Sequence, residues 1–182
     1  MIFPMQVGFS WHYKGILSGD AEPNLSLDIL LTVSDSLHFN DSTNFTLQAR
    51  TITTSTDTSL NNTNDTTMDS WQVLMNSNSY TRAEDSWPNV ILKTPIKRNL
   101  RWLFAPTGAD SIGGFLHITH PDTSVLVDST RYNHAIIVER DDPNGNSGTD
   151  NYIIVPGVGI VYEIHSVFFG GTCLKLVDRN FH

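Results

Sequence analysis

Four apolar runs near the end of the chain decide its fold class: AIIVER at residues 135–140, YIIVP at 152–156, VGIVYEIHSVFF at 158–169 and TCLKLVD at 172–178. They are rich in Ile, Val, Phe and Tyr, and segments with Gly, Asn, Asp and Pro separate them. Runs of this kind between turn formers are typical of β-strands. The last two runs meet at a Gly-Gly pair, which favours a hairpin.

The same pattern extends towards the N-terminus and predicts an all-β chain. Residues 6–13 and 25–33 alternate between apolar and polar side chains, as strands with one buried face do. Segments of this kind add up to about ten strands spaced by turns. The spacing favours a single-domain antiparallel β-sandwich, jelly-roll-like, over residues 1–182, with long loops and at most one short helix.

The short helix is predicted at residues 94–104. Thr94 suits the N-cap position and Pro95 the first helical position. The apolar residues that follow fall on one helical face, and a second proline ends the segment. A strand that ends in Trp102-Leu103-Phe104 is the alternative interpretation.

Residues 51–70 read TITTSTDTSLNNTNDTTMDS and contain few apolar side chains. We expect a long polar surface loop here, part of which continues the preceding strand; a polar edge strand is the alternative interpretation. A loop of this length in a compact domain usually has a function or is mobile.

Composition argues against several classes of function. The formal net charge of the chain is −8, and nucleic-acid binding needs a basic face, so we do not expect nucleic acid as a partner. The one cysteine, Cys173, excludes an intramolecular disulfide and a metal cluster built on cysteines. We expect no cofactor.

The N-terminus and the overall composition suggest a location. Residues 1–7 lack the basic and apolar regions of a secretion signal, and no apolar run is long enough to span a membrane. A polar, strand-rich chain without disulfides or a signal is typical of viral and phage particle proteins. We therefore expect assembly in a host cytoplasm and a place in the virion.

The surroundings of Ser111 do not match a serine hydrolase site. Ile112 interrupts the Gly-Asp-Ser-Gly-Gly loop of β-barrel serine proteases, and Ser111 precedes a strand-like segment rather than a helix. The sequence therefore predicts no catalytic residue, and we expect a protein that is not an enzyme.

Two groups of residues partly resemble metal sites. His117, His120, Asp122 and His134 carry zinc-type ligands, but the first two point to opposite faces of an extended strand. Residues 141–150 are rich in oxygen donors, yet they do not match an EF-hand loop. We predict no metal ligand.

Two groups of residues are candidates for contacts with partners. Basic residues next to tryptophans could dock on a neighbouring subunit, although on the predicted helix they could equally form a solvated face; they are Lys93, Lys97, Arg98 and Arg101. Aromatic residues could stack on a surface glycan, although core packing is their commoner use; they are Trp71, Tyr80 and Trp87, with Trp11 and Tyr13 as further candidates.

These observations favour a non-enzymatic structural protein of a viral or phage particle: a capsid, penton, decoration or tail component. Its partners would be copies of itself and other particle proteins, and the apolar residues 2–5 suit docking on a neighbour. The alternative is a carbohydrate-binding module or receptor-binding head that uses exposed aromatic residues.

Overall fold

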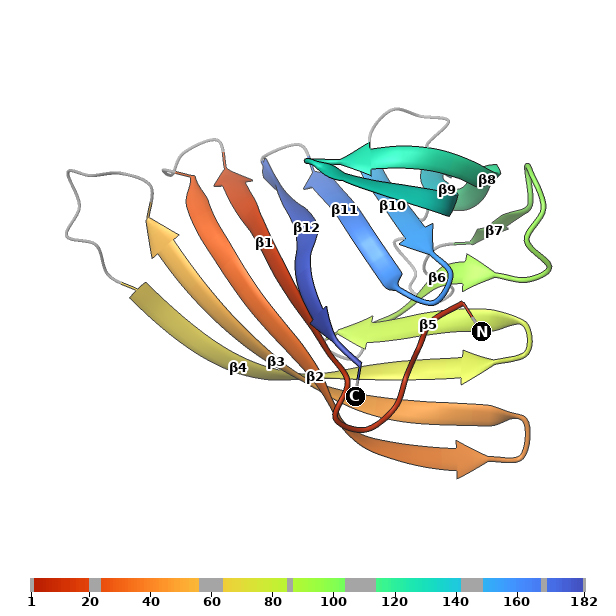
Figure 1. Cartoon of the computed structure of the whole chain (residues 1–182), viewed down its shortest axis with the longest axis horizontal. Helices are drawn as coiled ribbons and strands as arrows, with labels where there is room; N and C mark the ends of the chain where they lie inside the picture. The colour runs from red at the N-terminus through yellow and green to blue at the C-terminus, as the bar shows by residue number, and fades with distance from the viewer. Residues whose placement is uncertain are drawn as a thin grey trace.

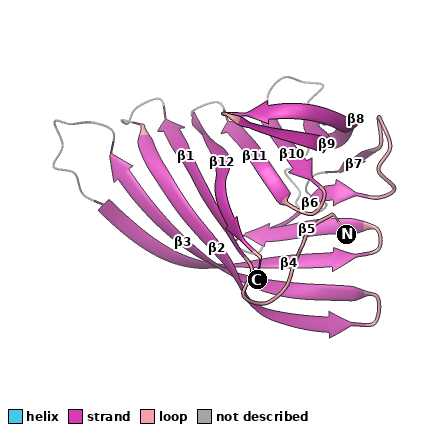
Figure 2. Ribbon diagram, viewed as in Figure 1, coloured by secondary structure: helices cyan, strands magenta, loops and turns pink. Residues whose placement is uncertain are grey.

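The computed structural model describes residues 2–19, 24–55, 64–84, 87–103, 114–141, 149–167 and 170–181, with the backbone alone at 84, 87, 88 and 167. All regular structure in these ranges is β-strand (Figure 2), so the all-β prediction is confirmed. They contain no helix of the length and apolarity that crossing a bilayer requires.

Twelve strands follow one another along the chain (Figure 1). In order they are β1 Ser10–Gly19, β2 Leu25–Phe39, β3 Ser42–Ser55, β4 Asn64–Asn76, β5 Ser79–Glu84, β6 Trp87–Lys93, β7 Arg101–Leu103, β8 Phe115–Val127, β9 Thr130–Asp141, β10 Thr149–Val155, β11 Gly159–Val167 and β12 Gly170–Asn180.

All twelve strands belong to one antiparallel sheet in the order β6-β5-β4-β3-β2-β1-β12-β11-β10-β9-β8-β7. Sequential strands are neighbours except β6 and β7, which form the two edges of the sheet. The first strand pairs with the last, from Ser10↔Asn180 to Gly19↔Gly170. Figure 1 shows that the sheet curls strongly, so that its edge strands β6 and β7 come to the same side of the molecule. The sheet is therefore nearly closed and barrel-like.

This topology corrects the prediction of a jelly-roll sandwich. A jelly roll divides its strands between two sheets through long crossing connections. Here the chain runs up and down between adjacent strands, and the pairing of β1 with β12 merges two six-stranded meanders into one sheet. Alternating strands separated by turns are common to both architectures, so their spacing could not distinguish them.

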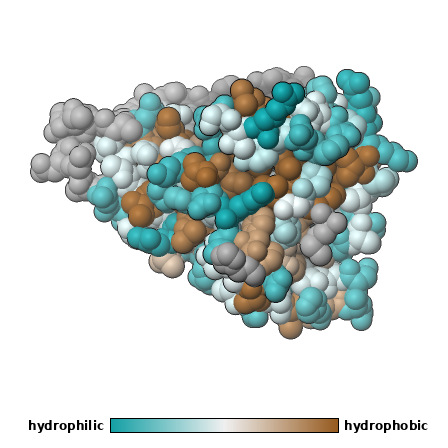
Figure 3. All heavy atoms as spheres, viewed as in Figure 1, coloured by the Kyte–Doolittle hydropathy of each residue, from teal (hydrophilic) through white to brown (hydrophobic). Residues whose placement is uncertain are grey.

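Alternate residues of each strand fill the interior of the sheet. Trp11 and Tyr13 of β1 are buried, and so are Leu27, Ile29 and Leu31 of β2, while polar side chains such as Asp28 lie between them. This period of two follows from the pleat, which sends successive side chains to opposite faces. The outer face shown in Figure 3 carries several apolar areas separated by polar side chains.

The helix predicted at residues 94–104 is wrong. Arg101–Leu103 is the strand β7, as in the alternative interpretation, and Phe104 lies outside the described residues. Backbone bonds to β8 extend this pairing by two residues: Asn99 N–H donates to Ile118 O at 2.7 Å, and Ile118 N–H donates to Leu100 O at 3.0 Å. Because these groups bond to a neighbouring strand, they are not available for a helical ladder.

The polar loop predicted at residues 51–70 is for the most part strand. β3 runs to Ser55 and β4 begins at Asn64, and the two pair in register from Thr51↔Thr67 to Thr54↔Asn64. Residues 56–63 lie outside the described residues. The first half of β4 is exposed at every position, so no apolar alternation marks it as a strand.

The N-terminal segment packs on its own sheet, which corrects the expectation that it docks on a neighbour. Phe3 is 3% exposed and stacks on Tyr80 of β5, with 3.7 Å between ring centroids. Gly157 N–H, in the turn between β10 and β11, donates to Ile2 O at 2.9 Å. The segment thus contributes side chains to the interior.

Candidate functional site: the interior cavity

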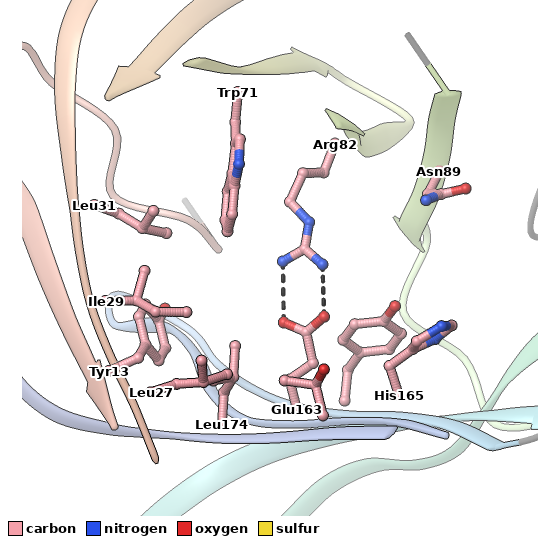
Figure 4. Close-up of a pocket in the computed structure, with 12 residues that line it drawn as sticks. Tyr13, Leu27, Ile29, Leu31, Trp71, Arg82, Asn89, Glu163, His165 and Leu174 are labelled. Carbon is pink, nitrogen blue, oxygen red and sulfur yellow. Dashed lines mark hydrogen bonds and ion pairs between the residues drawn. The ribbon is translucent and has the colours of Figure 1, made fainter. Parts of the chain in front are cut away.

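A cavity of about 320 Å³ lies inside the curved sheet (Figure 4). One wall comes from β1, β2, β10, β11 and β12, and side chains of β4, β5 and β6 face it from across the interior. The residues that line it are Tyr13, Leu27, Ile29, Leu31, Trp71, Arg82, Asn89, Tyr152, Glu163, His165, Thr172 and Leu174.

An ion pair crosses the cavity from one wall to the other. Arg82 of β5 donates from Nη1 to Glu163 Oε2 at 3.0 Å and from Nη2 to Glu163 Oε1 at 2.5 Å. Each side chain is 12% exposed. The paired geometry suits a planar guanidinium and a carboxylate, and each charge is compensated by the other in a poorly solvated place.

A second charged group lies in a row across three neighbouring strands. Asp150 of β10 is fully buried, and it accepts a 2.5 Å hydrogen bond from Arg140 Nη1 of β9 and another from His165 Nδ1 of β11. Asp150 and His165 are direct partners in the register of β10 and β11. Side chains opposite each other on one face of a sheet are close enough to bond.

His165 connects this row to the cavity. The hydrogen bond to Asp150 is the main cause that raises the pKa of His165 above its ordinary value; the charges of Asp150 and Glu163 add to it, while desolvation and Arg140 act the other way. The side chain is 46% exposed and lines the cavity. With Nδ1 held by Asp150, Nε2 is the ring nitrogen left to meet a ligand.

Leucine and isoleucine side chains form an apolar part of the wall. Leu27, Ile29 and Leu31 stand side by side on the inner face of β2, and Leu174 joins them from β12. Across the cavity, the Arg82 guanidinium lies 5.3 Å from the ring centroid of Trp71. Figure 4 shows the aliphatic group on one side of the Arg82–Glu163 pair and His165 on the other. The cavity therefore has an apolar end and a charged end.

The hydroxyl of Tyr13 has a structural role. It donates to Ile160 O at 2.9 Å, and burial raises the pKa of this phenol far above its usual range.

Among the described residues, no hydroxyl group is hydrogen-bonded to His165. Within the described ranges, the Asp150–His165 pair therefore has no bonded nucleophile of the kind that a Ser-His-Asp arrangement requires.

The predicted aromatic residues divide into three cases. Trp71 lines the cavity, whereas Tyr80 is buried beneath Phe3 and the side chain of Trp87 lies outside the described residues. Trp11 and Tyr13 point inward and donate to the carbonyl oxygens of Val158 and Ile160. The three named glycan contacts are therefore not seen together on one exposed surface.

The four basic residues are exposed, but they do not share a helix face. Lys93 ends β6, Lys97 and Arg98 follow in the connection, and Arg101 opens β7. Arg101 pairs with Asp141 at 2.9 Å and lies over the Phe115 ring at 4.1 Å. A role for them in subunit contact stays a prediction.

The remaining candidate residues from the sequence belong to the two candidate metal sites and the candidate hydrolase site. His134 Nδ1 bonds to Asp122 Oδ1 at 3.0 Å on the surface, and the described residues contain no group of three metal-ligating side chains. Residues 142–148 of the oxygen-rich segment, and Ser111, lie outside the described residues. Asp150, which closes that segment, bonds inward to Arg140 and His165.

Sequence reasoning missed the charged residues of the cavity. A signal existed in the run V-Y-E-I-H, where Glu163 and His165 share one face with buried apolar residues of β11. A charge on the buried face of a strand calls for a partner. The partner of Glu163 lies 81 residues away, so local pattern could not identify it.

Comparisons with known proteins show similarity in fold. No family model matches the chain, and no curated protein matches its sequence. A candidate exported protein with a YmcC-like fold from Bacteroides fragilis aligns over 99% of both chains with a TM-score of 0.57 and 8% identity. A candidate lipoprotein from Parabacteroides distasonis aligns over 98% of both chains with a TM-score of 0.54 and 11% identity.

These similarities overturn the expected location in a virion. Both matching structures come from bacteria, and their descriptions as exported protein and lipoprotein point away from a particle component assembled in a host cytoplasm. At this level of identity the shared property is the fold. The chain therefore has the overall architecture of these two bacterial proteins along nearly its whole length.

Proposed function

We propose that the protein is a binding protein that holds a small molecule in the interior cavity and does not transform it. One observation carries the proposal: Leu27, Ile29 and Leu31 face the Arg82–Glu163 pair within one cavity of about 320 Å³. Sites for small molecules are typically concave, mainly apolar, and equipped with a few convergent polar groups.

The charged residues support binding rather than catalysis. Arg82 and Glu163 satisfy each other in a bidentate pair, and Asp150 is bonded on two sides. Groups held in this way orient a ligand, whereas acid–base chemistry needs a group within reach of a reacting proton and a nucleophile. His165 has an imidazole nitrogen facing the cavity, and no nucleophile in the part of the chain that the structure describes is bonded to it.

Filling the cavity tests the proposal. The neutral dye N-phenyl-1-naphthylamine should bind the wild-type protein with a rise in fluorescence, and Leu27→Trp should abolish binding because its side chain occupies the lumen. Leu126→Trp is the matched control, since Leu126 is 69% exposed on the outside. Ile29→Phe gives a second filling variant, and an unfolding curve of each variant verifies its fold.

Two results would contradict the proposal: a wild-type protein that does not bind the dye, or filled variants that stay folded and bind it as well as the wild type does. The role in a particle suggested by composition stays a prediction, and we do not propose it.

A neutral saccharide is the second candidate ligand, favoured by Trp71 and Asn89, which both line the cavity. An aromatic face suits the apolar side of a sugar ring, and planar polar side chains suit its hydroxyls. A glycan array should then show binding that Trp71→Ala removes and Trp102→Ala does not, provided that both variants fold. Binding that survives Trp71→Ala would exclude this candidate.

A further inference from the structure

We propose that the ligand of the cavity is a small amphipathic anion whose carboxylate binds at His165 and whose apolar part lies along Leu27, Ile29, Leu31 and Leu174. This inference rests on the proposed function and specifies the chemical class of the ligand. It is carried by the bond from His165 Nδ1 to Asp150, which leaves Nε2 for a ligand, and by the position of His165 in a cavity that also has an aliphatic wall (Figure 4).

The carboxylates described at the charged end already hold cations. Glu163 bonds to Arg82 through two hydrogen bonds, and Asp150 bonds to Arg140 at 2.5 Å. His165 also bonds to Asp150, and this bond favours the protonated imidazole. The imidazole is half-exposed and lines the cavity, so a ligand carboxylate can approach the charge of its protonated form.

The geometry places this charge where a ligand can reach it. Asp150 is fully buried and holds Nδ1, whereas the imidazole is 46% exposed and lines the cavity. Nε2 therefore points away from the Asp150 bond, as the two nitrogens of an imidazole do. A protonated imidazole that donates to a carboxylate forms a charge-assisted hydrogen bond, which is about twice as strong as a neutral one.

Neighbouring side chains suit the same carboxylate. Thr172 of β12 is the direct register partner of His165 and lines the cavity, so its hydroxyl faces the same region. Asn89 lines the cavity from β6. Tyr13 stays protonated because burial raises the pKa of its phenol, so it adds no negative charge. Glu163, two residues from His165 on β11, is the one described carboxylate in the lining, and Arg82 occupies both of its oxygens.

The other end of the cavity determines the rest of the ligand. Four aliphatic side chains of β2 and β12 offer an apolar surface to the ligand. A ligand that is anionic throughout would leave this surface unused, and a neutral alkane would make no hydrogen bond to Nε2 of His165. A carboxylate with a short alkyl or aryl chain satisfies both ends.

A matched pair of ligands tests the inference. Octanoate and octanol differ in the charged group and share the alkyl chain, and each is titrated against the dye-loaded protein at pH 6. Octanoate should displace the dye about tenfold more strongly, as one additional charge-assisted hydrogen bond predicts. The preference should decline as pH rises and His165 loses its proton.

His165→Gln should remove the preference for octanoate while octanol binds as before, because glutamine keeps a polar group but cannot be charged. His120→Gln, at an exposed position of β8 outside the cavity lining, is the matched control and should keep the preference.

Each outcome has a separate meaning. Equal displacement by octanoate and octanol, or a preference that survives His165→Gln, would overturn the inference and leave the proposed function intact. If the dye itself does not bind, the proposed function fails first.

Discussion

The indole N–H of Trp102 donates a 2.7 Å hydrogen bond to the carbonyl oxygen of Val90, and this bond joins the two edge strands of the sheet, β7 and β6. Trp102 is 4% exposed, so the bond is protected from water. β7 contains three residues, and its ladder partner is β8. A side chain thus bridges the edges where no backbone ladder between β6 and β7 is described.

Trp102→Phe should lower the free energy of unfolding by about 1–3 kcal/mol, because it removes the donor and leaves a partly buried carbonyl without it. Urea unfolding measures the loss. Hydrogen exchange should also become faster at the amides of β6 and β7, because the edges are no longer joined.

Trp11→Phe is the matched control, because Trp11 Nε1 donates to Val158 O at 2.8 Å and this bond does not involve β6 or β7. We expect a similar loss of stability without faster exchange in β6 and β7. Equal exchange in the two variants would show that the Trp102 bond does not hold the edges together.

The Arg82–Glu163 pair should be costly to break and nearly neutral to replace. Glu163→Gln removes the carboxylate charge that pairs with the Arg82 guanidinium at a site where it is 12% exposed, and should cost about 3–5 kcal/mol. The double variant Arg82→Met with Glu163→Leu removes both charges and should be close to the wild type in urea unfolding. A double variant as unstable as Glu163→Gln would mean that the cost comes from packing.

The stability should depend on pH through His165. Its pKa is raised in the folded state, chiefly by the hydrogen bond to Asp150, so the protonated form favours folding. This contribution is fully present below the unfolded value of about 6.5 and is lost as pH rises through the folded pKa. Urea midpoints measured upward from pH 6 should therefore fall in the wild type.

His165→Gln should remove that part of the slope, since glutamine does not titrate. The control His120→Gln should keep it. An unchanged slope in His165→Gln would show that another group is responsible.

Gly15→Ala should destabilise the fold more than an ordinary surface change. A Cβ at this position of β1 would lie 2.0 Å from Cys173 O and 2.7 Å from Leu174 Cδ2, so the backbone of β12 would have to shift. We expect a loss of about 1–3 kcal/mol in urea unfolding, as overpacking costs.

Ile16→Ala, at a neighbouring position that is 50% exposed, is the control and should change stability little. A neutral Gly15→Ala would mean that β1 and β12 can separate without cost at this position.

Local pattern was a good guide where one face of a strand is buried and a poor guide elsewhere. The alternation of Leu27, Ile29 and Leu31 predicted β2 because those side chains point inward. The exposed half of β4 has no buried face, and its residues were assigned to a loop. At residues 94–104 capping preferences favoured a helix, but pairing with β8 decided the outcome.

The candidate site was less predictable than the fold. Trp71 and Tyr13 are aromatic candidates from the sequence, and both line the cavity. The charged residues of the lining were not predicted: Arg82 lies on β5, Glu163 and His165 lie on β11, and each one alone resembles an ordinary polar position. Their significance depends on which strands face each other across the lumen.

The amino-acid sequence by itself determined that the chain is built of antiparallel strands, because the pleat is a local property with a period of two residues. Tertiary structure decided that these strands form one nearly closed sheet, since the pairing of β1 with β12 joins the two ends of the chain. It also brought Arg82 to Glu163 and placed His165 at the charged end of a cavity. Contacts between residues far apart in the chain leave no periodic trace, so the curvature and the cavity follow from the folded arrangement.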